Sequence, residues 1–282
     1  MVFIFRLLSK LPLWQVHLLG AGLGRLTYCL SPTYRRHLRE NLAQAGFPPA
    51  LRGAVAAAAG KQALELAPIW FKPLAEVTPR VVQVSGWEIV EDAWKTGKGI
   101  VFLTPHLGCF EITAQYYAAH APITVLYRPP KRAFLQALIE MGRQRDDLHL
   151  APADVSGVRS LVKALKRGQA VGLLPDQAPR VGEGAWLDFF GKPAYTMTLA
   201  ARLTETGATT IFAWAERLPG GRGYHLRLRR ATIALEGGTM ARAAQINNEI
   251  EALVRECPTQ YLWGYNRYKR PAGAEPPPEE KL

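Results

Sequence analysis

The feature that most constrains the fold is an alternation of short apolar runs with amphipathic stretches, which begins near residue 100. Apolar strands are predicted at 100–104, 123–127 and 170–174. Helices are predicted between them, near 110–119, 132–145 and 158–166. Strands that are apolar throughout are typical of a sheet covered by helices on both faces. We therefore predict an α/β fold with a central, mostly parallel sheet flanked by helices.

The segments around this region extend the pattern. "RVVQVSG" is predicted as a strand, and "ATTIFAWAERL" and "YHLRLRRATI" as two antiparallel strands joined by "PGGRG". A helix is expected from Ser31 to Gly46, a second after "FPP" that Pro68 and Pro73 interrupt, and a last one near 240–255. Residues 31–271 are predicted to form one domain, and the proline-rich, charged segment 272–282 a disordered tail.

The N-terminal segment 11–30 is apolar over about the length of a membrane span, roughly 20 residues, although His17 and Arg25 interrupt it. No small-residue cleavage site follows, as a secretory signal would require. We predict that residues 1–30 contain an N-terminal membrane anchor helix, which either spans the bilayer or lies in its interface. A buried core helix is the alternative.

The charge and the metal-binding residue types narrow the possible partners. The net charge of +12 favours acidic partners, but the basic residues are scattered rather than gathered in a block, so no nucleic acid is expected. The cysteines Cys29, Cys109 and Cys257 lie far apart, and the histidines are equally dispersed. We therefore predict no metal site.

The stretch "TPHLGCFEI" is the strongest candidate for catalysis. His106 follows a predicted strand, where α/β sheets bind ligands. Glu111 comes five residues later, and in one continuous helix the two side chains would lie about 140° apart. A non-helical turn at Leu107 and Gly108 would let Glu111 hold one imidazole nitrogen, leaving the other as a base for a hydroxyl.

Two alternatives stay open for this stretch. His106 and Glu111 are also compatible with a polar pair on the rim of a core. Cys109 is a second possible nucleophile, although a cysteine in an apolar turn more often packs than reacts.

"TPHLGCFEI" resembles the signature of the lysophospholipid acyltransferase superfamily, a histidine followed after four residues by an acid. Further blocks in the same order resemble the bacterial lipid A late acyltransferases, the lauroyl and myristoyl transferases. These blocks are "RRHLRENLAQAGFP", "VLYRPPK", "LVKALKRGQAVGLLPDQAP", "DFFGKPAYT" and "PTQYLWGYNRYKRP". They span nearly the whole chain.

The resemblance implies a membrane-bound acyltransferase of lipopolysaccharide biosynthesis. It would move a fatty acyl chain from acyl carrier protein to a hydroxyl of a lipid A precursor, at the cytoplasmic face of the bacterial inner membrane. The departing thiolate would make this step favourable without a cofactor. His106 and Glu111 would be the catalytic dyad. The substrate-binding residues would be Arg128, Arg143, Asp176, Gln177 and Arg267. Phe189, Phe190, Gly191 and Thr196 would shape the acyl pocket or belong to the core.

The chain departs from the family pattern in its last block, where Tyr265 and Asn266 stand in place of the usual histidine and arginine. Other functions compatible with the sequence are the same chemistry on another glycolipid or glycerolipid, hydrolysis with water as acceptor, and non-catalytic lipid binding.

Overall fold

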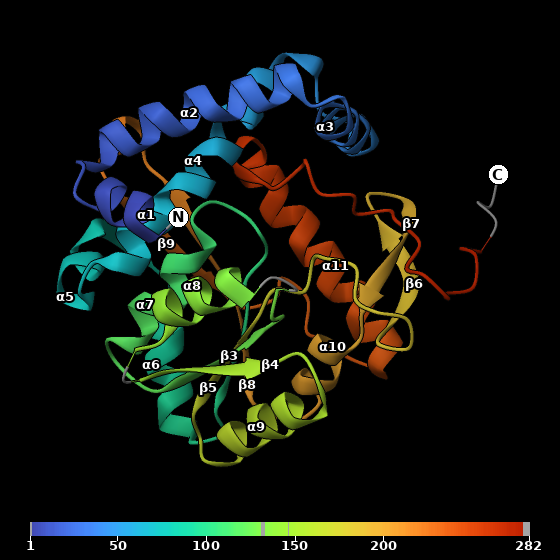
Figure 1. The fold of residues 1–282 in the computed structure, drawn as a ribbon. Helices are drawn as coiled ribbons and strands as arrows, with labels where there is room; N and C mark the ends of the chain where they lie inside the picture. Colours follow the sequence, from blue (N-terminus) through green and yellow to red (C-terminus); the bar gives the residue numbers. More distant parts are fainter. Residues whose placement is uncertain (1, 131–132, 146, 279–282) are drawn as a thin grey trace.

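The computed structural model describes residues 2–130, 133–145 and 147–278, and its centre is a seven-stranded sheet of order β1-β9-β8-β2-β5-β3-β4 (Figure 1). The strands are Val81–Ser85 (β1), Ile100–Leu103 (β2), Ile123–Tyr127 (β3), Leu148–Pro152 (β4), Ala170–Leu173 (β5), Thr209–Arg217 (β8) and Tyr224–Arg229 (β9). Every neighbouring pair is parallel except β8–β9. The predicted mostly parallel sheet and the antiparallel pair are confirmed.

Helices cover both faces of this sheet (Figure 1). Their bounds are Val2–Ser9 (α1), Leu13–Leu30 (α2), Pro32–Gln44 (α3), Arg52–Phe71 (α4), Leu74–Val77 (α5), Trp87–Thr96 (α6), Phe110–Ala118 (α7), Ala133–Arg143 (α8), Val155–Lys166 (α9), Leu199–Thr204 (α10) and Thr239–Glu256 (α11). Residue 132, the first of one predicted helix, lies outside the described residues. Short 3-10 turns occur at Pro49–Leu51, Thr78–Arg80, Pro219–Gly221 and Pro258–Gln260.

The apolar strands explain why helices lie on both sides. In β2, Val101 and Leu103 pack into the core that includes α3, α9, α10 and α11, whereas Ile100 and Phe102 pack into the core that includes α6 and α7. Successive side chains of a strand point to opposite faces, so a strand buried on both faces must be apolar throughout.

A two-stranded hairpin, Gly184–Phe189 (β6) and Lys192–Met197 (β7), stands beside the main sheet and was not predicted. Its turn places both Phe190 (φ +50°) and Gly191 (φ +70°) in the left-handed region. Phenylalanine is an uncommon residue there, so the sequence lacks the usual signal of such a turn.

The prediction that Pro68 interrupts its helix is wrong, since α4 continues through Pro68 to Phe71. Ile69 and Trp70 beyond it are buried, and the Arg145 guanidinium donates to the carbonyls of Ile69, Trp70 and Lys72. Burial and these hydrogen bonds offset the single backbone bond that proline removes.

Helix α2 packs against α4 backbone to backbone. A Cβ built on Gly24 would lie 2.0 Å from the carbonyl oxygen of Ala56, and one built on Gly60 would lie 1.9 Å from that of Gly20. Any residue larger than glycine would therefore push the two helices apart at these points.

The predicted helix of the N-terminal segment is present as α2, but none of the helices described has the length and apolarity needed to cross a membrane. Of the predicted tail, residues 272–278 are described, and Trp186 donates to the carbonyl of Glu275. Residues 279–282 lie outside the described part of the chain.

Candidate active site

His106 and Asp176 meet because they follow neighbouring parallel strands. Leu103 at the end of β2 pairs with Leu173 at the end of β5, and His106 and Asp176 stand at equal distances beyond these partners. The N–H of Thr104 donates to the carbonyl of Leu173 (2.9 Å), which extends the register toward the site. The carboxyl ends of parallel strands lie at one edge of a sheet, the usual place for a ligand.

The Asp176 carboxylate binds His106 twice. Its Oδ2 accepts the backbone N–H of His106 (2.9 Å), and its Oδ1 lies 2.8 Å from Nδ1 of the imidazole. Burial by itself would raise the pKa of Asp176, but the electrostatic attraction of the His106 side chain and these hydrogen bonds outweigh burial and hold the pKa below its ordinary value.

The ionised carboxylate fixes the imidazole tautomer. A carboxylate can only accept, so Nδ1 carries the hydrogen and Nε2 keeps its lone pair. The Gln177 side-chain amide lies 3.1 Å from Nε2 and donates to it. His106 therefore has the arrangement of a general base, with Nδ1 held by an acid and Nε2 ready to take a proton.

The predicted contact between His106 and Glu111 is wrong. Glu111, in the first turn of α7, instead accepts hydrogen bonds from Trp70 Nε1 (3.0 Å) and from Nε (3.0 Å) and Nη2 of Arg143. Among the described residues it makes no hydrogen bond to His106. Gly108 does make the expected non-helical turn (φ +61°), but the neighbouring strand supplies the acid. A catalytic role for Glu111 stays a prediction.

A cavity of about 240 Å³ opens beside His106. Its lining includes four of the predicted site residues: His106, Arg128, Arg143 and Gln177. A larger groove of about 650 Å³ shares part of this lining, including Leu126, Arg128 and Met197, so the two hollows adjoin. The imidazole thus lines the smaller of two adjoining, partly apolar hollows.

The arginines of the cavity differ in how firmly they are held. Arg143 is paired with Glu111, and its guanidinium lies 5.9 Å from the Trp70 ring centroid. Arg128 lies 3.6 Å from Glu183, and its side chain is 46% exposed. Arg143 is a fixed cation and Arg128 an accessible one, and both guanidinium groups suit phosphate or carboxylate ligands.

Arg267 lies elsewhere, contrary to the arrangement expected of a substrate-binding residue. Its side chain is buried and donates to the carbonyl of Tyr195 (2.8 Å) and to Oγ1 of Thr196 (2.7 Å), which holds the β6–β7 hairpin. It does not line the cavity at His106. Phe189 and Phe190 are likewise buried in the core.

Cys109 is 1% exposed, and burial raises the pKa of its thiol well above the ordinary value. A thiolate is the nucleophilic form of cysteine, so this environment disfavours the alternative of a nucleophilic Cys109.

Tyr265 makes a contact beside the site that was not predicted from the sequence. The Tyr265 hydroxyl accepts the N–H of Ala178 (3.0 Å), directly after Gln177. Tyr265 is one of the positions that departs from the family pattern, and this departure was the only signal that could have marked it. Within the described ranges, no group of three or more histidine, cysteine, aspartate or glutamate side chains is arranged to hold a metal ion.

Comparison with known proteins adds to this geometry. The sequence model of a family described as bacterial lipid A biosynthesis acyltransferase matches residues 1–270. The chain is 27% identical to a lipid A biosynthesis lauroyltransferase of Escherichia coli (strain K12), over 95% of the chain and 90% of the relative. It is 26% identical to the palmitoleoyltransferase of the same organism, over 76% and 70%, and 24% identical to its myristoyltransferase, over 86% and 77%.

Proposed function

Because the chain belongs to the bacterial lipid A biosynthesis acyltransferase family, we propose that it transfers a fatty acyl chain from acyl carrier protein to a hydroxyl of a lipid A precursor. The observation that carries this proposal is the 2.8 Å contact between His106 Nδ1 and Asp176, which leaves Nε2 as a base beside a cavity. The family resemblance supports the donor and the acceptor, and the geometry supports the acid–base chemistry.

In this mechanism the acceptor hydroxyl replaces the Gln177 amide at Nε2 of His106 and donates a hydrogen bond to this nitrogen. As its oxygen attacks the thioester carbonyl carbon, the proton moves to Nε2, and Asp176 stabilises the resulting imidazolium. The tetrahedral intermediate then collapses, the carbon–sulfur bond breaks, and the leaving sulfur takes the proton from Nε2. The products are an ester and the free thiol of the carrier, and His106 returns to its starting state.

The cavity arginines are proposed to bind the acidic groups of the substrates. Arg143 would face a phosphate of the acceptor while Glu111 and Trp70 keep its guanidinium in place. In this scheme Glu111 acts through Arg143 rather than through His106. Arg128, at the junction with the larger groove, would bind a second acidic group.

The larger groove is the proposed site for an acyl chain. Its volume of about 650 Å³ lies within the range of ligand sites, roughly 300–1,000 Å³. Its apolar lining comprises Leu126, Val155, Val158, Val162, Pro179, Met197, Leu199 and Leu203. A chain placed there would lead to the reacting carbonyl at His106.

The N-terminal helices are the proposed membrane contact. Large apolar side chains are exposed along α1 and α2: Phe3, Ile4, Leu7, Trp14, Leu18, Leu19, Leu23, Leu26 and Leu30. The basic residues Arg6, Lys10, Arg25, Arg36 and Arg39 lie exposed on or near these helices. Apolar residues with adjacent cations suit a helix that lies in the interface of an anionic bilayer, here the cytoplasmic leaflet of the inner membrane.

The test is acyl transfer by the purified chain from lauroyl-acyl carrier protein to a phosphorylated glucosamine-disaccharide precursor of lipid A, followed by mass spectrometry. The wild type should add the mass of one acyl group, and His106→Ala should add none. His120→Ala, which changes an exposed histidine remote from the cavity lining, is the matched control and should retain transfer.

The possible products separate the proposal from its alternatives. Free fatty acid without acylated lipid would indicate a hydrolase. Acylation only of an added glycerolipid would indicate a different acceptor. Transfer by His106→Ala at the wild-type rate would refute His106 as the base.

A further inference from the structure

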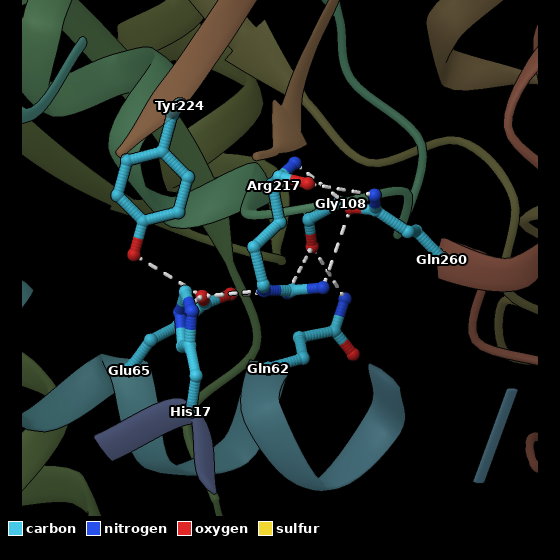
Figure 2. Close-up of polar contacts among 7 residues, drawn as sticks. All are labelled: His17, Gln62, Glu65, Gly108, Arg217, Tyr224 and Gln260. Atoms are coloured by element: carbon cyan, nitrogen blue, oxygen red, sulfur yellow. Dashed lines mark hydrogen bonds and ion pairs between the residues drawn. The ribbon is translucent and has the colours of Figure 1, made fainter. Parts of the chain in front are cut away.

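A second polar cluster lies buried behind the turn that follows His106, and the mechanism above does not use it (Figure 2). It contains His17 of α2, Gln62 and Glu65 of α4, Arg217 of β8, Tyr224 of β9 and Gln260. Glu65 is 0% exposed and Arg217 is 5% exposed, so an ion pair lies in the interior. We call this set the Glu65 cluster.

The Glu65 carboxylate is fully satisfied by donors. Arg217 donates to both of its oxygens, through Nε to Oε2 (2.8 Å) and through Nη2 to Oε1. His17 Nε2 lies 3.2 Å from Oε2, and the Tyr224 hydroxyl donates to Oε2 (3.1 Å). Burial by itself would raise the pKa of Glu65, but Arg217 and then His17 outweigh it and lower the pKa to about 2.

The other side of the cluster holds Gly108. The Gly108 carbonyl accepts from Gln62 Nε2 (3.0 Å) and from Arg217 Nη2 (3.3 Å), and the Gly108 N–H donates to the Gln260 carbonyl (3.1 Å). Gln260 is itself fixed, because its side-chain oxygen accepts the N–H of Arg217 (2.8 Å) and its amide donates to the Arg217 carbonyl (3.0 Å). Figure 2 shows the bonds from Gln62 and Arg217 converging on the Gly108 carbonyl.

The turn at Gly108 is held by its backbone neighbours as well. Gly108 has a φ of +61°, and a Cβ at this position would lie 2.0 Å from the Ala215 carbonyl oxygen. The Cys109 N–H donates to that same oxygen (2.8 Å), and the His106 carbonyl accepts the N–H of Leu262 (3.1 Å). The backbone from residue 106 to residue 109 is therefore fixed from outside the turn.

Net stability alone does not account for a buried ion pair at this place. Replacing such a pair with apolar residues of similar volume is often neutral or stabilising. What apolar residues cannot replace is the pair of N–H donors that hold the Gly108 carbonyl, through Gln62 and through Nη2 of Arg217.

We propose that Glu65, Arg217 and Gln62 are positioning residues for His106, acting through the Gly108 carbonyl. Glu65 orients the Arg217 guanidinium, Arg217 and Gln62 hold the carbonyl, and the fixed turn aims the imidazole at the acceptor hydroxyl. The inference rests on the proposed role of His106 as the base. A misplacement of about 1 Å costs on the order of 10²-fold in rate.

The first test replaces the ion pair with apolar residues in the double variant E65L/R217M, assayed with lauroyl-acyl carrier protein and the lipid A precursor. We expect kcat to fall about 10²-fold while KM changes by less than about threefold, because substrate contacts stay in place. The control R229M/E256L removes another ion pair between a strand and a helix, one whose two residues make no hydrogen bond to residues 106–109, and should keep kcat within about threefold.

A second comparison separates positioning from general loss of structure. If the cluster acts only through His106, then adding E65L/R217M to H106A should not lower the residual rate of H106A further. If the cluster merely holds the fold together, the combined variant should be slower than H106A.

Folding of each variant is checked by circular dichroism and thermal unfolding. Should E65L/R217M fail to fold, Gln62→Met decides the question, since it removes only one donor to Gly108. A folded E65L/R217M, or in its absence a folded Q62M, with wild-type kcat overturns the inference. Failure of the proposed function gives a different result, namely transfer by H106A at the wild-type rate.

Discussion

Replacing Asp176 with asparagine should prevent His106 from acting as a base while the two side chains remain hydrogen-bonded. The two carboxylate oxygens accept two hydrogens, the backbone N–H of His106 and the hydrogen on Nδ1. An amide offers only one oxygen. Because the backbone N–H cannot move its hydrogen and the imidazole can, we expect the amide oxygen to face the backbone and the NH₂ group to face Nδ1. Nδ1 must then accept, so the hydrogen moves to Nε2 and the lone pair is lost.

The size of the effect follows from this change of tautomer. The same substitution beside a catalytic histidine elsewhere lowers kcat by about 10⁴-fold, which corresponds to about 5 kcal/mol of activation free energy. We expect kcat for Asp176→Asn to fall by about 10³- to 10⁴-fold, with KM changed by less than about threefold, since no substrate contact is removed.

The assay is steady-state release of the carrier thiol over a range of pH, with ¹⁵N NMR of labelled histidine to report the tautomer. Glu111→Gln is the informative companion, because it alters the other carboxylate without touching the imidazole. It should raise KM through Arg143 and leave the histidine tautomer unchanged. If Asp176→Asn keeps kcat within tenfold of the wild type, or if Glu111→Gln changes the tautomer instead, the reasoning fails.

Two further predictions concern stability and membrane binding. The pKa of Glu65 is about 2 in the folded chain, against 4.5 ordinarily, so its contribution to the free energy of unfolding is present above pH 4.5 and is lost as pH falls toward 2. At 1.36 kcal/mol per unit of pKa difference, this contribution is roughly 3 kcal/mol. Denaturant titrations at several pH values should show this loss of stability in the wild type and not in E65L/R217M. An equal acid dependence in both proteins would contradict the assignment to Glu65. On the proposed membrane face, the double variant Leu18→Glu/Leu26→Glu removes two exposed leucines. Burial of each leucine in the bilayer would contribute about 1.5–3 kcal/mol to binding, so the affinity for phosphatidylglycerol vesicles, measured by co-sedimentation, should fall at least 100-fold. Ile233→Glu, a control on another exposed apolar residue outside α1 and α2, should bind as the wild type does, and equal loss in both variants would rule out this face.

The sequence was sufficient to predict six of the seven strands of the sheet and the place of His106, whereas the edge strand β4 was not predicted. Strands β2 and β5 are apolar throughout and β3 is apolar except for Thr124, so each has its own signal in the sequence. A histidine three residues after β2 must lie near the carboxyl edge of the sheet. These features depend on residues close together in the chain.

The partner of His106 depends on strand order, which local patterns do not contain. β5 lies between β2 and β3 although it follows both in sequence, and this crossover brings Asp176 to the imidazole. Glu111, only five residues away, was the attractive choice because a non-helical turn at Leu107 and Gly108 would let it reach the imidazole and because the family resemblance implies this pair. Asp176 was recognised as a site residue through the family resemblance, but as a substrate contact rather than as the acid that holds the base.

Long-range polar contacts were equally hidden. Nothing in the amino-acid sequence of α4 indicates a contact between Glu65 and Arg217, which follows it by 152 residues. A glutamate in an alanine-rich helix is more often solvated. Only the packed structure shows that this helix turns the glutamate inward.

The glycine contact between α2 and α4 has a practical consequence for anyone who shortens the chain. Because Gly20 and Gly24 bring α2 close to α4, His17 reaches Glu65, and Leu13 and Val16 are buried. Removing the first 30 residues to obtain a more soluble enzyme would remove α2, which covers one side of this buried region. Water would then reach the Glu65 carboxylate, and the ion pair between Glu65 and Arg217 would weaken. Low activity of such a truncated protein would then be no measure of what the bilayer contributes.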